Sequence, residues 1–307
     1  MKNSDAEWIQ GILSLKRERR AVILAHNYQL GEVQDMADFV GDSLELSQRA
    51  AETDAAVIVF CGVHFMAETA SILCPEKVVL LPDVHAGCPM ADMITPGRLR
   101  QKKDEHPQAV VVCYVNSSAE VKAESDICCT SANAIPIVES LDAEEIIFVP
   151  DQYLGQYVSD RTGKKMILWP GFCPTHARIT ADRVRELKQE YPRARLVVHP
   201  ECRPEVISLA DEVLSTGGMC RYAQREDVKE MIVGTEIGII HRLRKENPGK
   251  RFIPISEQAI CPNMKSITLE KVMWALEAME PEVRVPEEIR VKAKVAVDRM
   301  LAIGARR

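Results

Sequence analysis

The sequence predicts an α/β protein of three similar αβα domains, whose parallel sheets are arranged with pseudo-threefold symmetry around a central active site. Two observations support this prediction. Apolar, β-branched runs of strand length alternate with helix-like stretches along the whole chain. Polar motifs also recur at nearly equal intervals. Near-continuous apolar runs are typical of parallel strands that helices cover on both faces.

The elements follow one another in three sets. Residues 5–20 form an amphipathic stretch that predicts a first helix. Nine apolar runs then predict strands over residues 21–28, 55–63, 77–83, 109–116, 144–151, 164–171, 194–201, 236–243 and 251–255. Residues 286–303 predict a closing helix. We therefore expect a first α/β repeat with its N-terminal helix over 1–104, a second over 105–190 and a third with the C-terminal helix over 191–307.

Each set carries the same three polar features. Its first strand ends in a polar cluster, at residues 26–28, 114–116 and 199–201. A hydroxyl residue follows the start of each cluster by 17 positions and marks a helix start: Ser43, Ser131 and Thr216. A Cys-Pro pair follows each last strand, at Cys88, Cys173 and Cys261. Three features in register indicate a true internal repeat rather than coincidence.

The repeat predicts one shared pocket. Ligands of open α/β units bind beyond the carboxyl ends of the strands, where all three features are expected to lie. Three units around one axis would direct these ends inward. The hydroxyl residues can then act as ordinary N-caps, or they can bind anions together with the helix N-termini.

Composition excludes several classes of protein. The 307 residues are 46% hydrophobic and 27% charged, which is ordinary for a globular protein. No apolar run reaches the roughly 18 residues of a membrane helix, and the polar N-terminus does not resemble a signal peptide. A net charge of −6 and 5% aromatic residues disfavour nucleic acid as a partner. We expect a cytoplasmic protein that acts on small molecules, with no nucleic-acid or membrane partner.

The ten cysteines include no C-x-x-C pair, so a metal site would need cysteines far apart in the sequence. In a reducing compartment a disulfide framework is not expected. Three thiolates without a fourth protein ligand suit zinc with an open water position. They equally suit a [4Fe–4S] cluster with one iron left open. Buried loop thiols without a metal are the structural alternative.

Several strings of the sequence resemble the quinolinate synthase family. They include AHNYQ, VGDSLELS, GCPMADM, CYVNSSAEVKA, PGFCPTH, HPEC and QAICPNMK, in order between about Ala21 and Met273. The resemblance implies three α/β domains with pseudo-threefold symmetry and a [4Fe–4S] cluster held by Cys88, Cys173 and Cys261. It also implies the condensation of iminoaspartate with dihydroxyacetone phosphate to quinolinate, phosphate and two waters, in de novo NAD biosynthesis. The open iron would act as a Lewis acid.

One string departs from the family pattern. Some members carry a C-x-x-C at the third cysteine and are proposed to be redox-regulated there. Here residues 261–264 read Cys-Pro-Asn-Met, so this thiol pair is absent. The departure argues against thiol–disulfide regulation at this site and leaves the proposed chemistry unaffected.

Chemistry and the resemblance together suggest roles for individual residues. Glu201 is the candidate general base, and Tyr28 and Tyr114 are candidate proton donors. His26 and His199 offer imidazole groups for catalysis and binding. The substrates are anions, so substrate binding is expected from the polar clusters and the hydroxyls: His26, Ser43, Tyr114, Val115, Asn116, Ser131, His199, Pro200, Glu201 and Thr216. His176 and Lys122 are weaker candidates, for proton transfer and for anion binding.

Three other classes remain to be weighed against this prediction. Enzymes of diphthamide synthesis also hold a cluster with one cysteine per domain, but they lack the AHNYQ and HPEC strings. A hydrolytic zinc enzyme would differ in metal content. An electron carrier would not need histidine, tyrosine and glutamate around its cluster. An aspartate oxidase or dehydrogenase is the expected functional partner, since the imine must be supplied.

Overall fold

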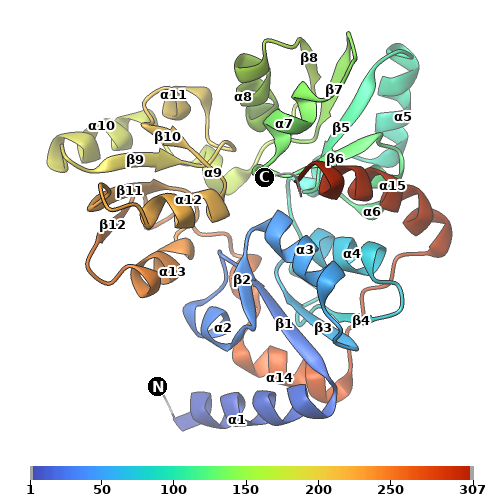
Figure 1. Ribbon diagram of the computed structural model, residues 1–307, viewed down its shortest axis with the longest axis vertical. Helices are drawn as coiled ribbons and strands as arrows, with labels where there is room; N and C mark the ends of the chain where they lie inside the picture. The colour runs from blue at the N-terminus through green and yellow to red at the C-terminus, as the bar shows by residue number, and fades with distance from the viewer. Residues whose placement is uncertain (1–2, 305–307) are drawn as a thin grey trace.

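The computed structural model describes residues 3–304 and contains three four-stranded parallel sheets. The sheets have the same strand order, in which the first strand lies between the second and third: β2-β1-β3-β4, β6-β5-β7-β8 and β10-β9-β11-β12. Every pairing between these strands is parallel. Figure 1 shows the three units around a common centre. The predicted α/β class with three similar αβα units is therefore confirmed.

The first unit follows helix α1 (Asn3–Glu18), close to the predicted first helix. Its strands are β1 (Ala21–His26), β2 (Phe39–Gly41), β3 (Val57–Cys61) and β4 (Val78–Leu80). Its crossover helices are α2 (Gly31–Met36), α3 (Ser43–Glu52) and α4 (His64–Leu73). All five residues of β3 are buried, as the unbroken apolar run 55–63 predicted.

The second unit repeats this plan after α5 (Pro96–Glu105). Its strands are β5 (Val110–Tyr114), β6 (Ile127–Cys129), β7 (Ile146–Val149) and β8 (Met166–Leu168). Its crossover helices are α6 (Ala119–Ala123), α7 (Ala134–Glu139) and α8 (Gln152–Thr162).

The third unit follows α10 (Ala181–Glu190). Its strands are β9 (Arg195–Val198), β10 (Glu212–Val213), β11 (Glu230–Gly234) and β12 (Arg251–Pro254). Its crossover helices are α11 (Pro204–Ile207), α12 (Thr216–Ala223) and α13 (Ile239–Glu246).

One predicted strand in this unit is wrong. Residues 236–243 lie largely in α13, and the real third strand, β11, comes just before them. The buried side chains Ile239, Ile240 and Leu243 have helical spacing, so one apolar helix face was mistaken for a strand. The short second strands β2, β6 and β10, of two or three residues, also escaped prediction.

The last two helices do not stay with the third unit. Helix α14 (Leu269–Ala278) packs on α1 and β3, and α15 (Glu287–Gly304) packs on α4, α6 and β6. Figure 1 shows α15 beside the second unit, far from β9–β12. The C-terminal helices therefore pack on the first two units rather than on the third. The domain boundaries 1–104, 105–190 and 191–307 remain a prediction. Across residues 3–304, no helix is long and apolar enough to cross a bilayer.

Candidate active site

The carboxyl ends of the three sheets surround one cavity. Its wall contains residues from all three units, as expected where parallel strands converge. The predicted residues that line it are His26, Tyr28, Ser43, Cys88, Tyr114, Asn116, Ser131, Cys173, His199, Glu201, Thr216 and Cys261. Val115 and Pro200 are buried but do not line it.

Two histidines are held in the same way by their local turns. The backbone N–H of Tyr28 donates to Nδ1 of His26 over 3.2 Å, and that of Glu201 donates to Nδ1 of His199 over 3.3 Å. Nδ1 is thus the acceptor in each ring, which places the proton on Nε2. Burial lowers the pKa of both imidazoles to about 3. Both rings are therefore neutral at pH 7 and act as Nε2–H donors.

The hydroxyl residues occupy different positions from those expected of N-caps. Ser43 and Thr216 are the first residues of α3 and α12, and the capping side chains are those of Asp42 and Ser215. The hydroxyls of Ser43 and Thr216 are therefore not used for capping. Ser131 does not begin a helix, and this prediction is wrong: α7 starts at Ala134, after a turn in which Thr130 N–H donates to Asn133 Oδ1.

Glu201 is a buried carboxylate held by neighbours from two units. Its Oε1 accepts a hydrogen bond from the Tyr114 hydroxyl at 2.5 Å, and its Oε2 lies 2.8 Å from Nδ1 of His176. Burial raises the pKa of this carboxyl, but the interaction with His176 and the hydrogen bonds from His176 and Tyr114 outweigh it and hold the pKa below its usual value. Arg203, two residues further along the chain, pairs with Glu205 instead. Glu201 is therefore ionised and directed into the cavity.

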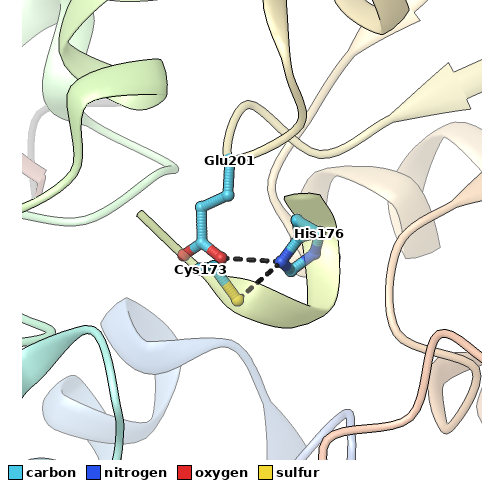
Figure 2. Close-up of side chains that lie close together, drawn as sticks. All are labelled: Cys173, His176 and Glu201. Carbon is cyan, nitrogen blue, oxygen red and sulfur yellow. Dashed lines mark hydrogen bonds and ion pairs between the residues drawn. The ribbon is translucent and has the colours of Figure 1, made fainter. Parts of the chain in front are cut away.

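His176 connects both sides of the site (Figure 2). Its Nδ1 faces the Glu201 carboxylate, which can only accept, so Nδ1 carries the proton. The same nitrogen lies 3.2 Å from Sγ of Cys173. Nε2 lies 2.8 Å from the Thr235 hydroxyl, which also contacts the hydroxyl of Tyr28. A continuous hydrogen-bonded chain thus links the two candidate proton donors through Thr235, His176 and Glu201.

Lys122 is not part of the cavity wall. Its side chain is fully buried, with Nζ donating to the carbonyl oxygen of Ser117 and lying 5.5 Å from the ring centre of Phe65. The interpretation of Lys122 as an anion-binding group of the site is therefore wrong. The side chain instead supports the segment that follows Tyr114.

The three predicted metal ligands differ from the other cysteines. Cys88, Cys173 and Cys261 are partly exposed, whereas the remaining seven cysteines are buried. Each follows the last strand of its unit and precedes a short helix: η1 (Ala91–Met93), α9 (Pro174–Ala177) and η2 (Met264–Ser266).

The loops direct backbone donors toward the sulfurs. Burial raises the pKa of Cys88 to about 12, and the N–H groups of Ala91 and Met90 act in the opposite direction. Backbone N–H groups two or three residues ahead also lower the pKa of Cys173 and Cys261 against the effect of burial. Three such thiols in one cavity fit a group that requires thiolates.

A second candidate ligand set includes only one of these cysteines. The donor atoms of Cys173, His176 and Glu201 lie within 4.8 Å of one another, close enough to hold a single metal ion. The set of three cysteines and this mixed set share Cys173, so metal content is needed to distinguish them.

Several residues in or next to the site escaped sequence reasoning. Asp42, Thr175 and Glu236 line the cavity, and Asn27 contacts Thr216 from behind. Glu236 is fully buried, and its Oε1 accepts the backbone N–H of Cys261 at 3.1 Å. It was missed because it is the first residue of the run that was taken for a strand, although a carboxylate two residues after the apolar strand β11 was the available signal.

The fold and site define an enzyme with three α/β units and one polar cavity lined by three thiols. A family model described as quinolinate synthetase A protein matches residues 10–302. The quinolinate synthase of Dehalococcoides mccartyi is 67% identical over 292 residues, covering 95% of this chain and 97% of that protein. The quinolinate synthase of Methanosarcina barkeri is 57% identical over 301 residues, covering 98% and 99%. The chain belongs to the quinolinate synthase family, whose enzymes serve NAD biosynthesis.

Proposed function

We propose that the enzyme condenses iminoaspartate with dihydroxyacetone phosphate to form quinolinate, phosphate and two waters, in the cytoplasm, as a step of de novo NAD biosynthesis. The observation that carries this proposal is the donor set of the cavity. Neutral Nε2–H imidazoles and hydroxyls that cap no helix line the cavity together with the ionised carboxylate of Glu201. Such donors suit two carboxylates and a phosphate, although the chain as a whole is negatively charged.

Cys88, Cys173 and Cys261 would hold a [4Fe–4S] cluster, the cofactor that the family resemblance implies. When bound, the cluster supplies an open iron site that acts as a Lewis acid. Its fit rests on the partial exposure of these three thiols and on the backbone donors around them. Glu236 supports this role, because its carboxylate holds the N–H of Cys261 and pairs with Lys265 over 3.0 Å.

The remaining residues divide proton transfer and orientation between them. Glu201 takes a proton from the substrate, as an ionised carboxylate can. Tyr28 and Tyr114 give protons, since burial and the nearby Glu201 charge raise the pKa of both well above the ordinary value and keep them protonated. Asn116 directs its Nδ2 at Glu201 over 3.5 Å. Among the described residues its buried Oδ1 has no partner, so this oxygen accepts a substrate N–H or O–H.

The imine substrate needs a supplier. Iminoaspartate hydrolyses in water, so an enzyme that oxidises aspartate at its amino group, an oxidase or a dehydrogenase, must act just before this one. We expect a functional link to such an enzyme, and neither a nucleic acid nor a membrane as partner.

The cysteines provide the test. Anaerobically purified protein should contain iron and sulfide and form quinolinate from the two substrates. Replacing Cys88, Cys173 or Cys261 by Ala should abolish both the cluster absorbance and turnover. Cys61→Ala and Cys202→Ala are matched controls, because these thiols are buried in the core, and they should retain the cluster. Stoichiometric zinc without iron, or a Cys173→Ala variant that keeps the cluster, would contradict the proposal.

A further inference from the structure

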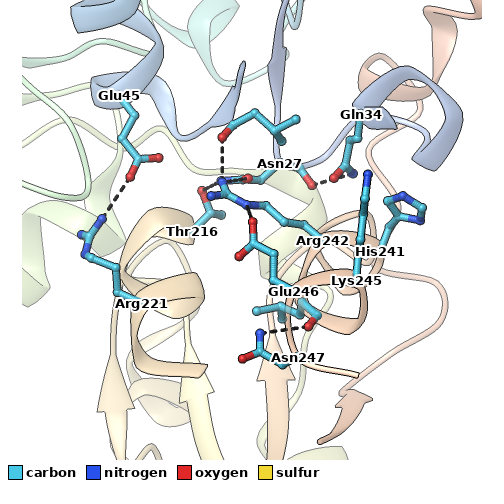
Figure 3. Close-up of polar contacts among 12 residues, drawn as sticks. Asn27, Gln34, Glu45, Thr216, Arg221, His241, Arg242, Lys245, Glu246 and Asn247 are labelled. Atoms are coloured by element: carbon cyan, nitrogen blue, oxygen red, sulfur yellow. Dashed lines mark hydrogen bonds and ion pairs between the residues drawn. The ribbon is translucent and has the colours of Figure 1, made fainter. Parts of the chain in front are cut away.

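A fully buried asparagine joins the first and third units behind the cavity (Figure 3). Asn27 follows β1, and its Nδ2 donates to Oγ1 of Thr216 over 2.8 Å. Its Oδ1 accepts from Nη1 of Arg242, on α13, also at 2.8 Å. Thr216 lines the cavity, whereas Asn27 and Arg242 do not.

Arg242 determines which way the amide of Asn27 points. A guanidinium group has only donors, so the atom of Asn27 that faces it must be the oxygen. Arg242 itself is anchored by two further acceptors: Nη1 donates to the carbonyl oxygen of Val40 at 2.8 Å and Nε to Glu246 at 2.7 Å. The amide nitrogen of Asn27 is thereby directed at Thr216 and cannot exchange places with the oxygen.

This orientation leaves the proton of Thr216 free. The Thr216 oxygen accepts from Asn27, and within residues 3–304 its hydroxyl has no acceptor. Ser215 caps α12, so the helix terminus does not use the Thr216 hydroxyl either. The one remaining place for the proton is the cavity that Thr216 lines.

We propose that Arg242 and Asn27 are positioning residues that hold the Thr216 hydroxyl as a hydrogen-bond donor for an anionic substrate oxygen, a carboxylate or a phosphate. The three donors point in one direction, from the cation through the amide to the hydroxyl, so each bond strengthens the next and the last favours an anion. The inference rests on the proposed function for the identity of the anion. The orientation itself rests only on the contacts of Asn27.

Asn27→Asp gives a sharp test, because it keeps the shape and turns the donor into an acceptor. The introduced carboxylate would retain the contact with Arg242, and Thr216 would then donate to this carboxylate rather than to the substrate. We expect kcat/KM to fall roughly 10- to 100-fold, as for the loss of a hydrogen bond to a charged group. Thr216→Val, which removes the hydroxyl, should cause a similar loss.

A double-variant cycle separates orientation from charge repulsion and from folding defects. Asn27→Asp should add little, less than about threefold, to Thr216→Val if both act through the same proton. If Asn27→Asp lowers kcat/KM equally in the wild-type and Thr216→Val backgrounds, the new charge or a structural change is responsible and the inference is wrong. Near-normal kinetics for Asn27→Asp would also overturn it.

Two further measurements keep the test independent of folding and of turnover. Arg242→Gln adds no negative charge beside Thr216, so it should lower kcat/KM less than Asn27→Asp does. In the Thr216→Val background it should lower kcat/KM no further. Binding of succinate and of inorganic phosphate, measured by calorimetry on the holoenzyme, shows which anion depends on Thr216. Weaker binding of either anion in Asn27→Asp, with no further weakening when Asn27→Asp is added to Thr216→Val, supports the positioning role even if the wild-type protein forms no quinolinate. In that case the proposed function alone fails.

Discussion

At the scale of single residues, Glu201 is the group on which the proposed chemistry depends most. The sequence showed it as the one carboxylate in the three polar clusters, and the structure adds its partners Tyr114 and His176. These donors keep it ionised, which a base requires, while lowering its basicity. Its position at the convergence of the second and third units explains why it rather than Asp151, which caps α8, faces the cavity.

Glu201→Gln should keep the cluster and the fold but lower kcat by about 10²–10⁴, because the amide cannot take a proton. Quinolinate formation under anaerobic conditions measures the loss, and the cluster spectrum checks that the site is intact. Glu205→Gln is the matched control, since this nearby carboxylate lies at the surface beside Arg203. Turnover of Glu201→Gln close to wild type would assign the base to another group.

His26 provides a prediction about pH. Its pKa is lowered to about 3 by burial, so between pH 6.5 and 3 the unfolded chain binds a proton there that the folded chain does not. The folded state therefore loses stability as pH falls below 6.5, and above that pH the effect is absent. His26→Asn should reduce the loss of stability between pH 7 and pH 5 by about 1–2 kcal/mol.

Urea unfolding midpoints of the anaerobic protein at the two pH values would measure this effect. His106→Asn is the control, because His106 lies at the end of α5 near the surface. An unchanged pH dependence for His26→Asn would mean that the ring is accessible to protons in the folded protein.

At the scale of elements, the repeat extends further than the features recognised in the sequence. Shortly after each cavity cysteine, an Ile-Thr pair begins the next long helix, with Thr95, Thr180 and Thr268 as the N-caps of α5, α10 and α14. Each threonine accepts a backbone N–H three residues ahead at 3.3–3.4 Å, and each preceding isoleucine is buried. The cysteine loop is thus held between the last strand and a capped helix in every unit.

The triple variant with alanine at these three caps should lower the free energy of unfolding by about 2–3 kcal/mol, near 1 kcal/mol for each cap. Thermal unfolding of the anaerobic protein measures it. The corresponding triple serine variant keeps the caps and should remain close to wild type. Equal stability of the two triple variants would show that these bonds contribute nothing.

At the scale of the whole molecule, a buried carboxyl group links the first two units. Glu68 on α4 accepts the N–H of Ala119, the first residue of α6, at 3.1 Å. Burial raises the pKa of this carboxyl, and the nearby positive charge of Lys122 opposes the shift. Lys122 is itself fully buried, so its positive charge offsets part of the cost of burying Glu68.

Lys122→Met should therefore destabilise the protein by about 1–3 kcal/mol, because it removes the positive charge that favours the ionised form of Glu68 and leaves the carbonyl oxygen of Ser117 without its donor. Adding Glu68→Gln should recover part of the loss, since no buried negative charge is then left. Lys103→Met, at a half-exposed site on α5, should cost under about 1 kcal/mol. Additive effects of the two buried substitutions would show that the units are not coupled through this pair.

Apolar runs and motif spacing were enough to predict the α/β class, the threefold repeat and one central cavity, because these features follow from the order and spacing of residues in the sequence. They also led to the cavity residues of the polar clusters and to the three partly exposed cysteines. Periodicity failed where one helix face, at residues 239–243, resembles a short strand, and where the second strand of each unit is only two or three residues long.

The way in which groups distant in the chain meet is visible only in the folded molecule. Packing places Asn27 between Thr216 and Arg242, which lie 189 and 215 residues away, and it buries Lys122 beside Glu68. It also places α14 and α15 on units that precede them in the chain. Hydrogen-bond direction and burial depend on neighbours from other units, and no local pattern in a single sequence records which units will pack together.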